Sequence, residues 1–119
     1  MSESIPWQKA EKRAKEYLKK KFKKNFSKQK LLIGGNEWEF DCVSEDKTIV
    51  AQVKLRKKNV KSSRGKFVRE VHDCLLLEKV KAKKRIFFFV SKKKFFEKFK
   101  RDTKGLISKK VEISDGKGG

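Results

Sequence analysis

The sequence predicts an α/β fold, in which one mixed sheet is flanked by helices. Apolar residues recur at three- and four-residue spacings from Trp7 to Phe22, the pattern of an amphipathic helix. Residues 36–54 then alternate apolar and polar side chains, which is the period of β-strands. The apolar run at 85–90 has the length of a strand that is buried on both faces. A helix, a hairpin and a buried strand in this order indicate a sheet covered by helices on both faces.

The length and composition predict a single folded domain. A chain of 119 residues forms one modest core and is too short for two. We expect this domain to cover residues 1–113, and residues 114–119 to form a flexible tail. Only 36% of the residues are hydrophobic, but ten of these are phenylalanine, which argues against disorder.

The net charge indicates a polyanionic partner. The chain has 35 lysine and arginine residues against 15 acidic residues, a formal charge of +20. Such an excess repels itself unless a polyanion offsets it, and nucleic acid is the commonest polyanion in the cytoplasm. A lysine-rich surface of the kind enriched in heat-adapted proteins is the alternative.

The sequence also indicates the cellular compartment and the redox state of the two cysteines. No apolar run approaches the roughly 20 residues that span a membrane, and the first residues lack the apolar core of a signal peptide. We therefore expect a cytoplasmic, nucleoid-associated protein without a membrane partner. Cys42 and Cys74 are too few for a zinc-site pattern. Reduced, buried thiols are expected in that compartment, and a disulfide between them is the alternative.

The predicted elements follow the chain in the order helix, three strands, helix, strand, helix, edge strand. Pro6 or Ser4 opens the first helix, because proline is tolerated in a first turn. Ser91 suits the N-cap of the third helix. The expected ranges are 7 to the low twenties, 66–83 and 92–102 for the helices, and 30–33, the two strands on either side of a turn at 44–47, 85–90 and 110–113 for the strands, with a basic loop at 56–65.

The helices carry a few residues whose surroundings matter. Glu11 lies on the apolar stripe of the first helix and is either a flanking residue paired with Lys15 or an inward-facing acid. The three phenylalanines of the third helix are expected in the core, with base stacking as the alternative. His72 is expected on a helix surface, because one imidazole without a partner builds no triad. The second helix carries a helically spaced set: Phe67, Val68, Val71, Cys74, Leu75 and Glu78.

The hairpin within 36–55 is the most informative stretch. We expect Asp41 to lie opposite Val50 or Gln52, so that Asp41, Gln52 and Lys54 converge on one side of the sheet. Acids beside a lysine on a packed sheet favour a metal-dependent active site. The expected faces are Trp38, Phe40 and Cys42 against Glu37, Glu39 and Asp41 in the first strand, and Ile49, Ala51, Val53 and Leu55 against Val50, Gln52 and Lys54 in the second.

Two basic stretches are candidates for contacting phosphates. The first ends the first helix, where cations also suit the negative end of the helix dipole. The second covers the loop at 56–65 and the start of the next helix, and a solvated loop is its alternative. The candidate nucleic-acid-binding residues are Lys20, Lys21, Lys23, Lys24, Arg56, Lys57, Lys58, Lys61, Arg64 and Lys66.

An acid on the first helix, Asp41 on the second strand and Gln52-Val53-Lys54 on the third resemble the PD-(D/E)XK nuclease superfamily. The glutamine before X-Lys is similar to the Mrr-type restriction endonucleases. The resemblance covers residues 7–102 and implies a restriction-endonuclease-like domain with an αβββαβ core. The chain departs from the pattern at two positions, because Phe40 replaces the proline before Asp41 and Gln52 removes one negative charge.

The resemblance implies a Mg²⁺-dependent DNA endonuclease of DNA repair, restriction or recombination, with Mn²⁺ as a possible substitute. Asp41 would be the principal metal ligand, joined by the amide oxygen of Gln52 and the backbone carbonyl of Val53. Lys54 would position the attacking water and stabilise developing negative charge. Glu11 would hold a metal-bound water or a second metal.

Further alternatives stay open at this point. Glu39 is either an auxiliary metal ligand or an exposed residue paired with a lysine. The chain is either an enzyme or a non-catalytic nucleic-acid-binding module on the same fold. RNA is a second candidate partner beside DNA. Cutting both strands of a duplex with one site per chain would favour a two-fold homodimer.

Overall fold

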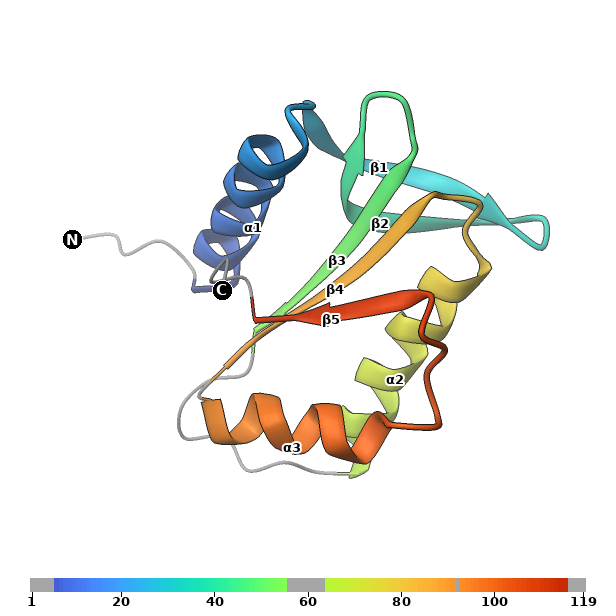
Figure 1. The fold of residues 1–119 in the computed structure, drawn as a ribbon. Coiled ribbons are helices and arrows are strands. Elements are labelled where there is room, and N and C mark those ends of the chain that lie inside the picture. The colour runs from blue at the N-terminus through green and yellow to red at the C-terminus, as the bar shows by residue number, and fades with distance from the viewer. Residues whose placement is uncertain (1–5, 56–63, 92, 116–119) are drawn as a thin grey trace.

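The structure is a computed structural model, and it describes residues 6–55, 64–91 and 93–115. Within these residues the chain forms three helices and five strands (Figure 1). The predicted α/β class is confirmed. None of the described helices is both long and apolar enough to cross a membrane. The elements are α1 (Pro6–Phe22), β1 (Phe26–Ile33), β2 (Asn36–Ser44), β3 (Ile49–Leu55), α2 (Arg64–Lys79), β4 (Lys84–Val90), α3 (Lys93–Thr103) and β5 (Val111–Ser114).

The five strands form one mixed sheet in the order β1-β2-β3-β4-β5. β1, β2 and β3 are antiparallel neighbours, whereas β3, β4 and β5 run parallel. Alternate residues of β4 enter two separate cores. Ile86 and Phe88 pack with α1, and Phe87 and Phe89 pack with α2 and α3. The helices therefore cover both faces of the sheet (Figure 1), as expected from the sequence.

α1 turns a narrow stripe of small and apolar side chains toward the sheet. Ala14 and Leu18 are buried and pack in one cluster with Phe88, while Lys15 and Glu16 between them are exposed. The helix ends before Lys23, which takes a left-handed conformation at φ 54°. Its amide donates to the carbonyl of Lys19 at 2.9 Å. This closure satisfies a free carbonyl of the last turn and directs the chain into β1.

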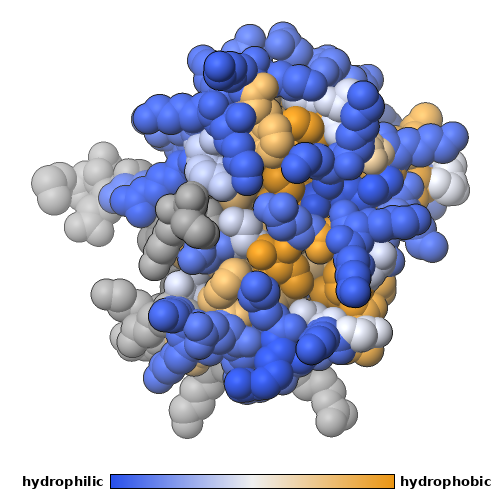
Figure 2. All heavy atoms as spheres, in the orientation of Figure 1, coloured by the Kyte–Doolittle hydropathy of each residue, from blue (hydrophilic) through white to orange (hydrophobic). Residues whose placement is uncertain are grey.

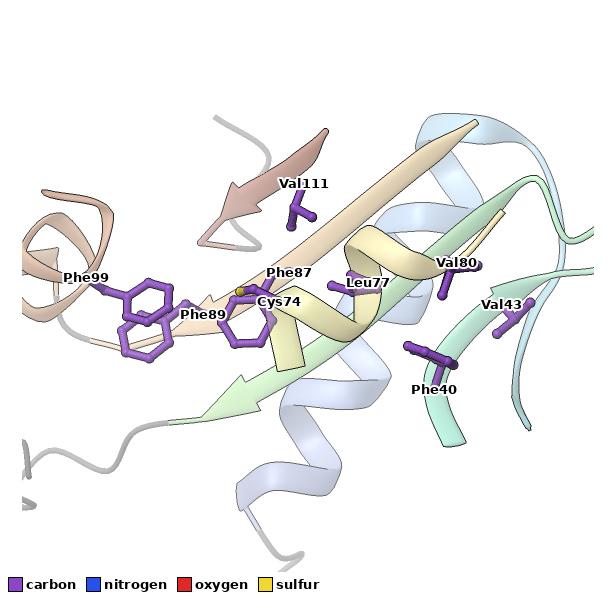
Figure 3. Close-up of a cluster of buried hydrophobic side chains, with 10 residues drawn as sticks. Phe40, Val43, Cys74, Leu77, Val80, Phe87, Phe89, Phe99 and Val111 are labelled. Atoms are coloured by element: carbon purple, nitrogen blue, oxygen red, sulfur yellow. The ribbon is translucent and has the colours of Figure 1, made fainter. Parts of the chain in front are cut away.

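The larger core lies between the sheet and helices α2 and α3. Figure 3 shows its side chains in a row along the sheet, from Phe99 of α3 past Leu77 of α2 to Val43 of β2. The rings of Phe89 and Phe99 stack with their centroids 4.5 Å apart. The other two phenylalanines of α3 are half-buried against the same cluster. The expected core role is confirmed for Phe99, whereas Phe95 and Phe96 pack against the core and stay partly exposed.

α2 differs from the predicted helix in its ends and in its inward face. It spans 64–79 rather than 66–83. Val68 and Leu75 of the helically spaced set are 56% and 41% exposed, whereas Glu70 is 1% exposed. A face that contains Val68 and Leu75 and a face that contains Glu70 both have helical spacing, so the sequence pattern alone does not show which face is buried. Packing against the sheet decides the rotation of the helix.

Three other elements extend beyond their predicted ends. β1 begins at Phe26 rather than at residue 30, and β5 runs one residue into the predicted tail. α3 ends at Thr103, which is buried and donates its hydroxyl to the carbonyl of Phe99 at 2.7 Å. The predicted basic loop lies mostly outside the described residues, and Arg64 and Gly65 belong to α2.

Asp46 fixes the turn between β2 and β3. Its carboxylate accepts hydrogen bonds from the amide and hydroxyl of Thr48 (3.1 and 2.7 Å) and from the hydroxyl of Ser44 (2.7 Å). It also forms an ion pair with Lys24. Lys24 is the largest cause holding the pKa of Asp46 well below its usual range. The predicted polar turn at 44–47 is confirmed.

Both cysteines are buried free thiols. Cys42 packs in the cluster under α1 and Cys74 in the cluster under α2, on opposite faces of the sheet. Burial raises the pKa of the Cys42 thiol to about 12 and also raises that of Cys74. The expected reduced, buried thiols are confirmed.

The packing of α1 is testable with two leucines. Leu18 is fully buried, whereas Leu32 is 72% exposed on β1. We expect Leu18→Ala to lower the free energy of unfolding by about 2–5 kcal/mol, because it leaves a cavity under α1. Leu32→Ala should change it by less than about 0.5 kcal/mol. Urea denaturation measures both, and equal effects would contradict the placement of α1 on the sheet.

Candidate functional site

A β-bulge at Asp41 and Cys42 shapes the candidate site. Ser27 of β1 pairs with Val43, and Gln29 pairs with Phe40, so two residues of β2 lie opposite the single residue between them on β1. An extra residue reverses the alternation of side chains beyond it. Phe40 and Val43 accordingly share the α2 cluster, while Cys42 packs under α1. The expected grouping of Phe40 with Cys42 on one face is therefore wrong.

Side chains replace the backbone ladder between β2 and β3 at this point. The paired residues of these strands are Cys42 with Ala51 and Val43 with Val50. This register excludes Val50 as the partner of Asp41 and places Gln52 there instead. We call the position where the ladder gives way to side-chain bonds the fork, and its residues are Asp41, Gln52 and Val53.

Three hydrogen bonds hold the fork. The amide of Val53 donates to Oδ2 of Asp41 at 2.8 Å. The amide of Asp41 donates to Oε1 of Gln52 at 2.9 Å, and Nε2 of Gln52 donates to the carbonyl of Glu39 at 3.1 Å. The Asp41 carboxylate and the Gln52 amide thus bridge the two strands. The expected meeting of Asp41 and Gln52 is present, with Gln52 bound to the backbone of β2.

Glu11 lies on the α1 side of the fork. It is 19% exposed, and its Oε1 lies 3.4 Å from Nζ of Lys28 on β1. Glu11 is the largest cause raising the pKa of Lys28, and Asp41 and Glu39 raise it further. Of the two alternatives from the sequence, a flanking residue paired with Lys15 or an inward-facing acid, the structure shows a partly buried acid with a partner on β1. Glu39 is exposed beside this group.

Lys54 lies on the opposite side of the fork. Ala51 and Val53 pack toward α1 and Val50 packs toward α2, so alternation places Lys54 on the α2 face. Its charge acts there on Asp73 of α2. Burial raises the pKa of Asp73, and Lys54 opposes that rise. By the same alternation Gln52 shares this face of β3 with Lys54, and the charges of both Glu11 and Asp73 act on Asp41. The expected convergence of Glu11 and Lys54 with Asp41 stays a prediction.

Asp41 is the acid of the fork, and its surroundings raise its pKa. Burial raises its pKa from 3.8 to about 6, and the hydrogen bond from Val53 opposes that rise. Glu11 on one side and Asp73 on the other raise it further, while Lys28 lowers it. Negative charge therefore accumulates around a carboxylate that is shielded from water. Such a site favours a proton or a bound cation.

The oxygen atoms available at the fork are of the type that binds Mg²⁺ in proteins. The second carboxylate oxygen of Asp41 and a second lone pair on Gln52 Oε1 remain as donors. The carbonyl of Val53 points to the same side of β3 as its amide, and so toward the fork. Mg²⁺ takes one or two carboxylates and keeps several waters. Within the described residues, however, no three His, Cys, Asp or Glu side chains lie close enough together to hold a metal alone.

The structure assigns different surroundings to the candidate nucleic-acid-binding residues. Lys20 and Lys23 are exposed at the end of α1. Lys21 is also exposed and donates to the hydroxyl of Tyr17 at 3.3 Å. Lys24 is bound to Asp46, so it stabilises the turn. Lys66 is half-buried, Arg64 opens α2, and Arg56, Lys57, Lys58 and Lys61 lie outside the described residues.

Sequence reasoning missed Asp73 and Lys28. A signal for Asp73 exists, because Glu70, Asp73, Cys74 and Leu77 follow the spacing of one helical face. Two acids on such a stripe indicate that polar side chains lie on the sheet side of α2. Lys28 gives no such signal, because its pairing with Glu11 depends on how α1 lies across β1.

Comparison with known proteins adds no relative. No family model, no curated protein and no solved structure matches the chain. The chemistry of the site therefore rests on the contacts, burial and charges of its own residues.

The raised pKa of Asp41 predicts how stability depends on pH. An acid with a raised folded pKa stabilises the fold below its unfolded pKa and loses that contribution as pH rises through its folded pKa. Asp41→Asn should therefore become more stable relative to wild type between pH 4 and pH 7 in EDTA. The shift to about 6 corresponds to about 3 kcal/mol, and partial exposure reduces the expected change to roughly 1–2 kcal/mol.

Asp46→Asn is the matched control, because its pKa is shifted in the opposite direction. This substitution should destabilise the protein throughout that range and lose its effect only at lower pH. Denaturation with urea at several pH values measures both variants. If the stability of Asp41→Asn relative to wild type stays constant with pH, the acidic environment of the fork is not as described.

Proposed function

We propose that the chain is a Mg²⁺-dependent nuclease that hydrolyses phosphodiester bonds of DNA, with the fork as its metal site. The observation that carries the proposal is the placement of Asp41, whose partly buried carboxylate is held by Val53 between two further acids. The charge of +20 supports a nucleic-acid substrate. The resemblance to the PD-(D/E)XK superfamily supports the same reaction.

The fork residues would hold the metal through oxygen atoms. The Asp41 carboxylate, the Gln52 amide oxygen and the Val53 carbonyl are the proposed ligands, with Mn²⁺ as a possible substitute for Mg²⁺. When bound, the ion offsets the charge of the scissile phosphate and lowers the pKa of a water. Glu11 orients water from the α1 side, where Lys28 fixes its carboxylate. Glu39 is exposed beside them and serves at most as an auxiliary ligand.

The α2 side would supply the remaining polar groups. Lys54 stabilises negative charge that develops on the phosphate, because a fixed cation in a shielded site is effective at that task. The charge of Asp73 raises the pKa of Asp41, and the charge of Lys54 lowers the pKa of Asp73. We therefore propose that Asp73 provides the second carboxylate of the site, because Gln52 is neutral. One site per chain favours a two-fold homodimer for cutting both strands of a duplex.

A non-catalytic nucleic-acid-binding module is the second candidate. The observation that favours it is that the described residues offer no three-acid metal group, while Gln52 is neutral and already bound to the backbone. Binding by lysines alone would still fall steeply with salt. RNA would then be as plausible a partner as DNA. Either function suits a cytoplasmic, nucleoid-associated protein.

A plasmid-cleavage assay with charge-matched variants tests the proposal. We expect wild type to nick plasmid DNA with Mg²⁺ and to lose this activity in EDTA. Asp41→Asn and Asp73→Asn should each lower the rate by roughly 10²-fold or more, because each removes a charge that acts only at the reacting centre. Lys54→Ala should lower it by a similar factor.

Asp46→Asn is the control, since it removes the same charge at the turn, away from the fork. It should retain the wild-type rate within about threefold. Cleavage that is equal in all variants would refute the assigned site. Absence of cleavage by wild type, together with salt-steep binding that survives Asp41→Asn, would instead establish the non-catalytic module.

A further inference from the structure

A second surface feature lies at the edge of the sheet, along β5. Two adjoining hollows of about 290 and 470 Å³ share Lys100 and Ile113, and we call them together the β5 cleft. α1 and α3 cover opposite faces of the sheet, yet side chains of both line the smaller hollow. Within the described part of the chain, five cations and two acids line the whole cleft. The cleft therefore carries a net positive charge.

The smaller hollow combines aromatic rings with lysines. Nζ of Lys21 lies 5.6 Å from the centroid of the Tyr17 ring, and Nζ of Lys100 lies 5.6 Å from that of Phe96. Tyr17 also packs edge-on against Phe88 of β4, with centroids 5.8 Å apart, which fixes its ring. Two aromatic side chains, each with a cation beside it, suit a ligand that contains both flat aromatic rings and negatively charged groups.

The larger hollow combines an apolar floor with a basic rim. Ile107, Val111 and Ile113 form the floor. Figure 2 shows apolar surface in the middle of this face, in the region where Figure 1 places β5, with hydrophilic side chains around it. Among the residues that the structure describes, no acid lines this hollow, and the four cations that line it are all exposed: Lys100, Arg101, Lys104 and Lys109.

The cleft lies at the same end of the sheet as the fork. Val53 of β3 pairs with Phe88 of β4, and Phe88 pairs with Ser114 of β5. Neighbouring strands are about 4.8 Å apart, so Ser114 lies roughly 10 Å from Val53. Ser114 lines the smaller hollow. Phe88 itself is buried, so an extended ligand held at the fork would reach the cleft around the end of β4, where Val90 is half-buried.

We propose that the β5 cleft binds a single-stranded segment of nucleic acid that continues from the fork. Its bases lie against the rings of Tyr17 and Phe96 and the apolar floor, and its phosphates contact the basic rim. A duplex does not fit this description, because its bases face each other and leave no ring for the cleft. This inference rests on nucleic acid being the partner, and it does not require cleavage.

Binding of labelled oligothymidine and of a duplex of equal length to the full chain in EDTA tests the proposal. The double variant Lys100→Gln/Lys104→Gln removes two cleft cations. We expect it to weaken single-strand binding about tenfold and to reduce the salt slope by about 1.4. Duplex binding should weaken by less than about twofold. Fluorescence anisotropy measures both affinities, and circular dichroism confirms that the variants fold.

Lys93→Gln/Lys94→Gln is the matched control, because both lysines are exposed on α3 and neither lines the cleft. It should change single-strand and duplex affinity equally and by less than about twofold. Equal losses in the two double variants would overturn the cleft assignment, as would displacement of oligothymidine by polyglutamate of the same charge. Binding of the duplex alone would refute the cleft only, whereas binding of neither probe would refute the nucleic-acid function itself.

Discussion

The hydrogen bond from the Val53 amide to the Asp41 carboxylate is the contact on which the candidate site depends. The bulge in β2 takes Asp41 out of the regular alternation, and this bond then fixes its carboxylate between β2 and β3. Gln52 completes the bridge by binding the backbone of β2 on both sides of Phe40. Without these side-chain bonds the two strands would end their pairing at Cys42 with unsatisfied backbone groups.

The fork is an acidic point in a strongly basic protein. The chain as a whole attracts a polyanion, but Glu11, Asp41 and Asp73 would repel a phosphate that approached the fork. A divalent cation bound at Asp41 would reduce this conflict, because it would offset the carboxylate charge and bind the phosphate at once. In the absence of a cation, burial raises the pKa of Asp41, and the neighbouring acids raise it further. The charge pattern therefore supports a metal-dependent site more than any single residue does.

Much of the fold was predictable, because helices and strands have clear periods in this sequence. The turn at 44–47 and the buried run at 85–90 follow from local patterns, and the same patterns left Val50 and Gln52 as the two candidate partners of Asp41. The bulge does not, since Asp41 and Cys42 continue the alternation of apolar and polar residues and nothing in their identity marks an extra residue. The pair of Glu11 with Lys28 was also out of reach, because it depends on the position of α1 over the sheet. Asp73 was detectable from its helical spacing with Cys74 and Leu77.

The most direct test of the fork as a metal site is a crystal structure of the chain soaked in Mn²⁺, with anomalous scattering used to locate the ion. We expect a peak about 2 Å from the free carboxylate oxygen of Asp41 and from the carbonyl of Val53, with waters completing an octahedral shell. The same crystals of Asp41→Asn should lose that peak. Manganese bound only at other positions, with the fork empty in the wild-type protein, would contradict the assignment of the fork as a metal site.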